Sequence, residues 1–425
     1  TEERDKYLAD DNPALAAFPY ANGGLFADEN IEIPPFTEEL KNVLLSKASE
    51  DFDWAAISPT IFGAVFESTL NPETRRSGGM HYTSIENIHK VIDPLFLDGL
   101  KAELEEIKEI AVERTRVSRL KAYQSKLAGL TFLDPACGSG NFLTESYISL
   151  RRLENDALRC QTDQITMGDY ANPIQVSIHQ FYGIEINDFA ATVAKTALWI
   201  AESQMLKETE DIIAHQIDFL PLKSYANITE GNALRLNWED VVPKAELNYI
   251  MGNPPFVGNN NQNNEQRADM QLILGGAGKT VDYVAGWYFK GAEYIQNTGI
   301  RVAFVSTNSI TQGEQVAAIW KSLYSKYKIH IDYAHRTFRW DSEASLKAHV
   351  HCVIIGFSVA PQKGKKILFT TERVQEVENI NAYLMDAPDV FIESRKHPLC
   401  NVPEIRKGNQ PTDGGHLIIE AADLG

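Results

Sequence analysis

Short apolar runs alternate with longer amphipathic segments through most of the chain, and this alternation predicts an α/β protein. The clearest apolar runs cover residues 131–134, 181–186, 248–252 and 301–308. Between such runs the apolar positions recur at helical spacing, as in residues 189–205. Strands that alternate with helices build a mostly parallel sheet with helices on both faces. The carboxyl ends of these strands are therefore the expected place for a ligand crevice.

One strand runs directly into a glycine-rich turn and then a helix. Thr131–Phe142 reads Thr-Phe-Leu-Asp-Pro-Ala-Cys-Gly-Ser-Gly-Asn-Phe. Gly138 and Gly140 lack side chains where the backbone must bend, which lets a ligand approach the main chain. The helix from Asn141 to about Leu158 directs its N-terminal amides toward this turn. The segment predicts a pocket for a nucleotide-like ligand, although such turns also occur for steric reasons alone.

A second buried strand stops at the tetrapeptide Asn253-Pro254-Pro255-Phe256. Two prolines cannot continue a central strand, so Asn253 is expected at its carboxyl end. In an open parallel sheet the carboxyl ends of the strands share one edge. We therefore expect the glycine turn and Asn253 to meet at that edge.

These two motifs, in this order, resemble those of the S-adenosylmethionine-dependent DNA adenine-N6 methyltransferases of the gamma class. Further segments are similar to the MmeI-like (type IIL) restriction-modification proteins, namely Gly79–Ser84, Phe181–Glu185, Ser306–Gly313 and Ala334–Phe338. The resemblance covers nearly the whole chain. It implies a Rossmann-like, seven-stranded class I methyltransferase sheet with an N-terminal helical region.

The resemblance assigns the catalytic role to Asn253, Pro254, Pro255 and Phe256. The exocyclic amine of adenine is a poor nucleophile because its lone pair is delocalised into the ring. The Asn253 side-chain oxygen and the Pro254 carbonyl can accept its two hydrogens, and Phe256 offers a face for the base. The implied reaction is methyl transfer to N6 of an adenine flipped out of double-stranded DNA, within a restriction-modification or phage-defence system.

The residues expected to bind S-adenosylmethionine come from four parts of the chain. Glu185 ends a strand, where a carboxylate can accept hydrogen bonds from ribose hydroxyls. Asn232 stands where many relatives have aspartate, and its carbonyl can accept from the adenine amine of the cofactor. The expected set is Tyr82, Thr83, Asp134, Pro135, Ala136, Cys137, Gly138, Gly140, Asn141, Phe142, Glu185, Ile186, Asn232 and Ala233. For the neighbouring Asn187 we favour a helix-capping role.

Two polar segments leave alternatives open. Residues 257–280 read as a long loop, either a mobile cover over an extruded base or an ordinary surface loop. Residues 335–340 interleave cations with aromatics, a composition that suits phosphate contact and base stacking. A solvated loop held by its own aromatics is the alternative there. The candidate DNA-binding residues are Arg336, Arg339 and Lys347.

We divide the chain into a helical connector (1–76), a methyltransferase domain (77–360) and the start of a truncated target-recognition region (361–425). In the family such a connector follows a nuclease, so a fused or associated nuclease and target-recognition domain are possible partners. A packing subdomain without chemistry is the alternative for the first region. Within the second, residues 84–99 predict a capped amphipathic helix and residues 103–126 a charged, solvated helix.

The composition is that of an ordinary soluble protein, with 44% hydrophobic and 23% charged residues. No apolar run approaches the roughly 18 residues that span a bilayer. The four cysteines lie far apart without a Cys-x-x-Cys pair, which indicates a reducing cytosol and no zinc or other metal site. We expect a cytoplasmic protein without membrane partners. Since the sequence starts at Thr1 and stops at Gly425 after an apolar run, we also expect a fragment of a longer protein.

The net charge of -18 is the main observation against DNA binding, because phosphate neutralisation drives non-specific affinity. Either basic residues gather on one face, or most DNA contacts belong to a missing part of the protein. Cytosine-N4 enzymes normally have serine in place of Asn253, and protein glutamine methyltransferases are smaller, so both are less favoured. A non-catalytic DNA-binding or assembly subunit with a regulatory cofactor pocket remains a different class of hypothesis.

Overall fold

The computed structural model describes residues 35–47, 57–60, 62–63, 83–161, 173–213, 217, 226–340, 350–360, 364–393, 395, 397 and 400–403. The chain divides into two compact units, Thr1–Phe391 and Ile392–Gly425. The described residues of the second unit contain neither helix nor strand. All elements below belong to the first unit.

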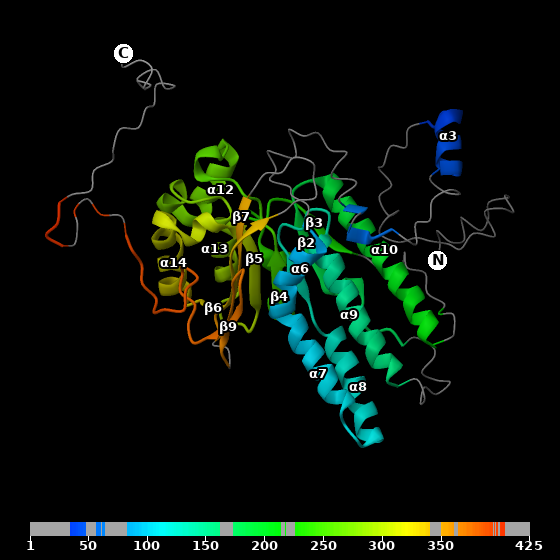
Figure 1. Ribbon diagram of the computed structural model, residues 1–425. Helices are drawn as coiled ribbons and strands as arrows, with labels where there is room; N and C mark the ends of the chain where they lie inside the picture. The colour runs from blue at the N-terminus through cyan, green and yellow to red at the C-terminus, as the bar shows by residue number, and fades with distance from the viewer. Residues whose placement is uncertain are drawn as a thin grey trace, which may run out of the picture. The chain divides into compact units, whose positions relative to one another are not determined.

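A nine-stranded sheet forms the centre of the first unit, in the order β3-β2-β1-β4-β5-β7-β6-β8-β9 (Figure 1). Its strands are β1 (Phe132–Asp134), β2 (Phe181–Glu185), β3 (Asn227–Glu230), β4 (Tyr249–Gly252), β5 (Arg301–Thr307), β6 (His330–Trp340), β7 (Val350–Ser358), β8 (Lys366–Phe369) and β9 (Val374–Val377). β1 pairs in parallel with β2 and β4, and these pair in parallel with β3 and β5. The expected α/β class is confirmed.

The far side of the sheet contains the antiparallel strands. β7 pairs antiparallel with both β5 and β6, so β6 runs in the same direction as β5. β8 pairs in parallel with β6, and β9 pairs antiparallel with β8. The sheet thus has two strands more than the seven expected. These two strands lie in residues 366–377 and extend the same sheet; the proposed domain boundary at residue 360 stays a prediction.

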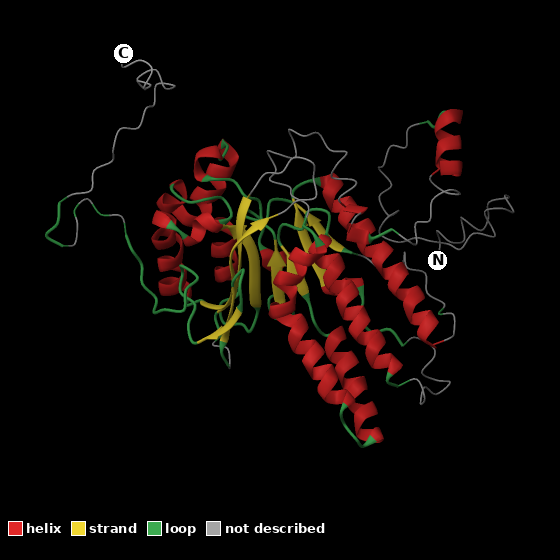
Figure 2. Ribbon diagram, in the orientation of Figure 1, coloured by secondary structure: helices red, strands yellow, loops and turns green. Residues whose placement is uncertain are grey.

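Helices cover both faces of the sheet (Figure 2). The helices of the described chain are α3 (Glu38–Leu45), α6 (Ile85–Ile92), α7 (Asp98–Lys108), α8 (Glu113–Ala128), α9 (Asn141–Arg159), α10 (Asp188–Ile213), α11 (Trp238–Val241), α12 (Asn264–Leu274), α13 (Ala285–Tyr294) and α14 (Gly313–Tyr327). The N-terminal helical region is represented by α3 and by the helical residues 59–60 and 62–63. Among the described residues, no helix is both long and apolar enough to cross a membrane.

Alternate residues of the central strands enter two separate hydrophobic cores. Phe132 packs with α6 to α10, whereas its neighbour Leu133 packs with α11, α13 and α14. In β5, Ala303 belongs to the first core and Phe304 to the second. Because successive strand side chains point to opposite faces, a strand buried on both faces reads as a continuous apolar run. This explains the short apolar runs in the sequence.

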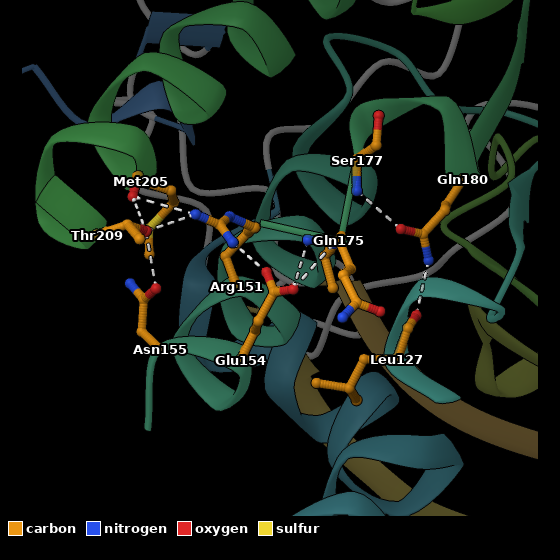
Figure 3. Close-up of polar contacts among 10 residues, drawn as sticks. Leu127, Arg151, Glu154, Asn155, Gln175, Ser177, Gln180, Met205 and Thr209 are labelled. Carbon is orange, nitrogen blue, oxygen red and sulfur yellow. Dashed lines mark hydrogen bonds and ion pairs between the residues drawn. The ribbon is translucent and has the colours of Figure 1, made fainter. Parts of the chain in front are cut away.

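A buried polar network ties α9 to α10 inside the first core (Figure 3). The fully buried Arg151 forms an ion pair with Glu154 and donates to Thr209 Oγ1 at 2.6 Å. Glu154 Oε1 in turn accepts from the backbone N–H of Gln175 at 2.7 Å and of Val176 at 3.2 Å. A buried carboxylate therefore anchors the chain just before β2.

Two expected helices differ in the structure. The charged segment 103–126 is divided between α7 and α8, which are separated by a turn at residues 109–112. α8 is not merely a solvated face, because Leu120, Tyr123 and Leu127 on one stripe are buried. The helix expected at 84–99 begins as predicted, with the Ser84 hydroxyl accepting from Asn87 N–H, and continues through a π-helical segment at Asp93–Leu97.

Two expected loops contain regular structure. Residues 257–280 include α12, which begins with a capping box in which Asn263 and Gln266 accept each other's backbone N–H groups. Residues 335–340 are not a loop but the carboxyl half of β6, paired with β7. Their aromatic residues lie within a strand, where such residues are common.

Candidate active site

The two predicted motifs meet at one cavity of about 330 Å³ at the carboxyl ends of β1, β2 and β4. Gly138 and Asn253 both line it. The parallel pairing of β1 with β4 brings Asp134 beside Gly252. A Cβ atom on Gly252 would lie 2.4 Å from Asp134 Oδ1, so any larger residue here would require Asp134 or the backbone to move. The sheet register therefore creates the juxtaposition that the sequence predicts.

The glycine turn is held open by the acid that ends β2. Gly138 and Gly140 adopt positive φ values of 53° and 82°, which favour glycine. The buried Glu185 carboxylate accepts from the backbone N–H of Gly138 at 2.9 Å and of Asn187 at 2.9 Å. Burial raises the pKa of Glu185, although these two amides oppose the change. The carboxylate thus fixes the turn, and it also lines the cavity.

Asp134 lies behind the turn rather than in the cavity. Its Oδ1 accepts from Ala136 N–H at 3.0 Å, while its Oδ2 is buried without a hydrogen-bond partner among the described residues. Burial raises the pKa of Asp134 to about 8. Burial also raises the pKa of the neighbouring Cys137 thiol, which therefore stays neutral. Neither group has the properties of an exposed nucleophile.

The side-chain oxygen of Asn253 is a hydrogen-bond acceptor that receives no hydrogen bond from the described residues. Its Nδ2 donates to Thr83 Oγ1 at 3.2 Å, and Thr83 is itself buried at 4% exposure. Asn253 Oδ1 is buried and has no hydrogen-bond partner in the described part of the chain. Buried polar atoms are nearly always paired, so an orphaned oxygen at a cavity wall indicates that a ligand donor completes it.

The opposite wall includes α12, which the sequence analysis read as loop. Asp269 of α12 is 2% exposed and accepts from Asn232 Nδ2 at 2.9 Å and from Tyr283 Oη at 2.8 Å. Arg235 donates to its other oxygen at 2.6 Å. Asn232 Oδ1, the atom expected to accept from the cofactor, already accepts from Leu234 N–H at 2.9 Å. Asp269 is therefore an acid of this wall that sequence reasoning missed.

The family model described as MmeI, DNA-methyltransferase domain, matches residues 108–370. The chain belongs to this family. The resemblance expected from the sequence is thereby confirmed.

Relatives of this MmeI-family chain agree with that assignment. DNA methyltransferase A of Bacillus subtilis (strain 168) is 40% identical over 420 residues, which cover 97% of this chain and 46% of the relative. A putative type II restriction enzyme and methyltransferase of Methanocaldococcus jannaschii is 26% identical over 279 residues, 57% of this chain and 23% of the relative. The chain therefore spans less than half the length of each of these curated relatives.

A solved structure is also similar over nearly the whole chain. The type IIL restriction-modification enzyme MmeI in complex with DNA matches with a TM-score of 0.87 and 44% identity. The match covers 97% of this chain and 55% of that one.

Most residues expected at the cofactor site of this MmeI-family domain line the main cavity. They are Thr83, Pro135, Ala136, Cys137, Gly138, Asn141, Phe142, Glu185, Ile186, Asn232 and Ala233. Asp134 and Gly140 support the turn from behind, and Tyr82 lies outside the described residues. Their individual roles stay predictions.

Only some of the expected catalytic residues line the cavity. Asn253 and Pro255 line the cavity, whereas Pro254 and Phe256 do not. Phe256 is half-buried and packs against both hydrophobic cores. Asn187 caps α10, its side chain accepting from Ala190 N–H at 2.9 Å, and it also lines the cavity.

The cavity also contains lining residues that sequence reasoning did not select. They are Ser139, Ile184, Gly231, Asn263, Glu265, Gln266, Asp269, Tyr283 and Trp287. Trp287 Nε1 donates to the Pro135 carbonyl at 3.0 Å and so joins α13 to the glycine turn. The only sequence signal for the α12 group was the capping box that marks the start of that helix. Within the described residues, no group of three or more histidine, cysteine or acidic side chains could hold a metal ion.

Proposed function

We propose that this MmeI-family domain transfers a methyl group from S-adenosylmethionine to the N6 amino group of an adenine flipped out of double-stranded DNA, as the modification part of a restriction-modification or phage-defence system. The observation that carries the proposal is the buried, unpartnered Asn253 Oδ1 beside the glycine turn. It supplies the acceptor that adenine-N6 chemistry needs at the place where a methyl donor would be bound.

The residues at the cavity fit S-adenosylmethionine. Gly138 leaves the backbone accessible, and α9 begins at Asn141 directly after the turn. Glu185 and Asp269 place carboxylates at two separate parts of the wall, where polar groups of a nucleoside can be recognised. When bound, S-adenosylmethionine supplies a sulfonium methyl group that needs no further activation.

The residues of the chain then act on the adenine. Asn253 Oδ1 accepts one hydrogen of the exocyclic amine, and the Pro254 carbonyl is the proposed acceptor for the other. Both contacts favour a pyramidal nitrogen with an available lone pair, and one such preorganised contact is worth about 3–4 kcal/mol. Thr83 holds the Asn253 amide so that its oxygen, not its nitrogen, faces the substrate. Phe256 is the proposed stacking surface, a contact worth about 1–3 kcal/mol per base.

The test uses the intact natural protein with genomic DNA and methyl-labelled S-adenosylmethionine, followed by nucleoside analysis. The expected product is N6-methyladenine, and label in cytosine or in protein would overturn the proposal. Asn253→Ala is expected to lower the rate by about 10²–10³-fold. Calorimetry together with the transfer assay separates the alternative hypothesis, because a non-catalytic subunit would bind S-adenosylmethionine but transfer no methyl group.

A further inference from the structure

A second cavity of about 330 Å³ lies between β6 and the turn that joins β8 to β9. Its lining residues are all polar, and they provide two arginines and three threonine hydroxyls. The arginines are Arg336 on β6 and Arg373 in the turn. The threonines are Thr337, Thr370 and Thr371.

This cavity is on the same edge of the sheet as the main cavity. β4 pairs in parallel with β5, β7 is antiparallel to both β5 and β6, and β8 is parallel to β6. β4, β5, β6 and β8 therefore all run in one direction, and their carboxyl ends share an edge. Asn253 follows β4, whereas Thr370 follows β8. A ligand long enough to extend along this edge can reach both cavities.

The strand geometry aims Arg336 and Thr337 at this position. In the pairing of β6 with β7, His335 is opposite Ile354 and Phe338 is opposite Cys352, so two residues of β6 oppose one of β7. Such a bulge re-aims side chains and occurs next to binding sites. On the other side, His335 stacks on Phe369 of β8 with ring centroids 4.1 Å apart and an interplanar angle of 4°. The stack fixes β6 against β8 at the residues next to Arg336 and Thr370, which line the cavity.

The turn is equally fixed. Thr370 N–H donates to the Arg373 carbonyl at 2.9 Å, and Arg373 N–H donates to Thr370 Oγ1 at 3.0 Å. When the Gln375 amide is oriented so that its oxygen and its nitrogen both have suitable hydrogen-bond partners, the oxygen accepts from the Arg373 guanidinium. Neither Arg336 nor Arg373 forms an ion pair with a described residue. Arg373 is thus held in place by its turn, and both positive charges remain available for a ligand.

We infer that this cavity, called here the β6–β8 pocket, binds one backbone phosphate of the DNA whose base enters the main cavity. The inference rests on the proposed function. Guanidinium groups bind phosphate oxygens in a planar, bidentate manner, and threonine hydroxyls are common further donors. The pocket also accounts for DNA contact on a chain of net charge -18, because it concentrates positive charge at the required edge. The single acidic residue among the described residues that line the pocket, Glu372, opposes this positive charge. Its removal by substitution is therefore a further test of the inference.

The first experiment measures binding of labelled genomic duplex fragments to the intact protein over a range of salt concentrations. The double variant Arg336→Gln/Arg373→Gln is expected to bind on the order of tenfold more weakly. The slope of log K against log salt should fall by about 0.9, the value for one phosphate. Arg336→Lys/Arg373→Lys keeps the charge and should retain the slope while losing part of the affinity.

Two controls make the result specific. Arg119→Gln removes an exposed charge from α8, which leads to the opposite edge of the sheet at the start of β1, and should leave binding unchanged. Glu372→Gln removes the opposing charge and should strengthen binding by about threefold, the range of an exposed charge pair. A misfolded variant cannot bind more tightly, so this gain separates the pocket from a structural role.

The second experiment measures methyl transfer into genomic DNA. The double arginine variant should raise KM for DNA, while its affinity for S-adenosylmethionine by calorimetry stays at the wild-type value. An unchanged salt slope and unchanged KM would overturn the inference. Failure of the proposed function has a different signature, since the wild-type protein itself would then transfer no methyl group and the salt slopes would still report on the pocket.

Discussion

The side chains of Asn253 and Thr83 form a hydrogen bond of 3.2 Å across a separation of 170 residues. Thr83 directly precedes the cap of α6, and Asn253 directly follows β4. The bond uses the amide nitrogen of Asn253 and leaves its oxygen buried and unpartnered. Thr83 therefore selects which end of the amide faces the cavity, which makes it a positioning residue in the proposed reaction.

Thr83→Val removes this acceptor and should lower kcat by about tenfold, because the Asn253 amide loses the contact that orients it. Thr83→Ser keeps the hydroxyl and should restore most of the rate. Steady-state methylation of genomic DNA distinguishes the two, with kcat and KM for DNA determined separately. Equal rates for the valine and serine variants would show that the bond does not orient Asn253.

Glu185→Gln places an amide NH₂ where a carboxylate oxygen now accepts a backbone N–H. The glycine turn should lose its shape, and S-adenosylmethionine should bind about 10- to 100-fold more weakly, the cost of about 1–3 kcal/mol for an unsatisfied buried group. Isothermal calorimetry measures the change. Glu230→Gln is the matched control, since Glu230 is the exposed residue opposite Glu185 in the register of β2 and β3. Equal affinity losses in the two variants would contradict the expectation.

Gly252→Ala should destabilise the protein by about 1–3 kcal/mol, because the added Cβ would lie 2.4 Å from Asp134 Oδ1. Any relief of this clash moves Asp134 or the backbone next to Asn253, so activity should fall as well. Gly299→Ala is the control, since a Cβ there meets no atom within 4 Å. Thermal unfolding followed by circular dichroism compares the two Tm values. Equal Tm values would exclude the predicted clash.

Arg151→Met should destabilise the protein by about 3–5 kcal/mol, because it leaves the Glu154 carboxylate buried without its partner. Both side chains are fully buried in the network of Figure 3. Arg152→Met changes the next residue of the same helix, which is exposed, and should alter stability by less than about 0.5 kcal/mol. Urea unfolding gives both free energies. A small loss for the buried arginine would show that Glu154 is satisfied by backbone amides alone.

The stability of the protein should depend on the ionisation of Asp134. Burial raises its pKa in the folded state to about 8, whereas an unfolded aspartate titrates near about 3.9. Between these values the folded state binds more protons, so the contribution of this group to stability is complete below about pH 4 and is lost as pH rises toward 8. The slope reaches at most about 1.4 kcal/mol per pH unit. Asp134→Asn should flatten this part of the curve.

Urea unfolding of the two proteins at several pH values between 5 and 8 measures the difference. The asparagine variant should gain stability relative to the wild type as pH rises. Parallel curves would mean that Asp134 is ionised throughout this range in the folded state.

The local features of the sequence predicted much of the fold. Strand positions followed from apolar runs, and Asn253 was placed at a strand end because two prolines cannot continue a sheet. The glycine turn was recognised because glycine removes the side chain where the backbone must bend sharply. The split of the charged segment into α7 and α8 was missed, since charged residues give little signal for a break in a helix that buries only one stripe.

Elements with weak patterns could not be predicted in the same way. β8 and β9 are short, half-exposed strands, so alternation over a few residues did not distinguish them from a loop. Residues 335–340 were read as a loop because their cations interrupt the apolar pattern, but β7 supplies a pairing partner for them. The polar composition of α12 gives no clear apolar periodicity, so the capping box at its start was the only sequence signal for this helix.

The sequence by itself determined the family, the α/β class and the two strand ends at which the proposed chemistry takes place. The family followed from the resemblance of these motifs to those of known methyltransferases. The class and the strand ends are consequences of local periodicity and of the conformational limits of glycine and proline. Only the tertiary structure decided that Thr83 forms a hydrogen bond with Asn253, that Asp269 enters the cavity wall, and that Arg336 and Arg373 line one pocket. Each of these contacts joins segments that are separate in the chain, and it depends on sheet register and helix packing, which no local pattern records.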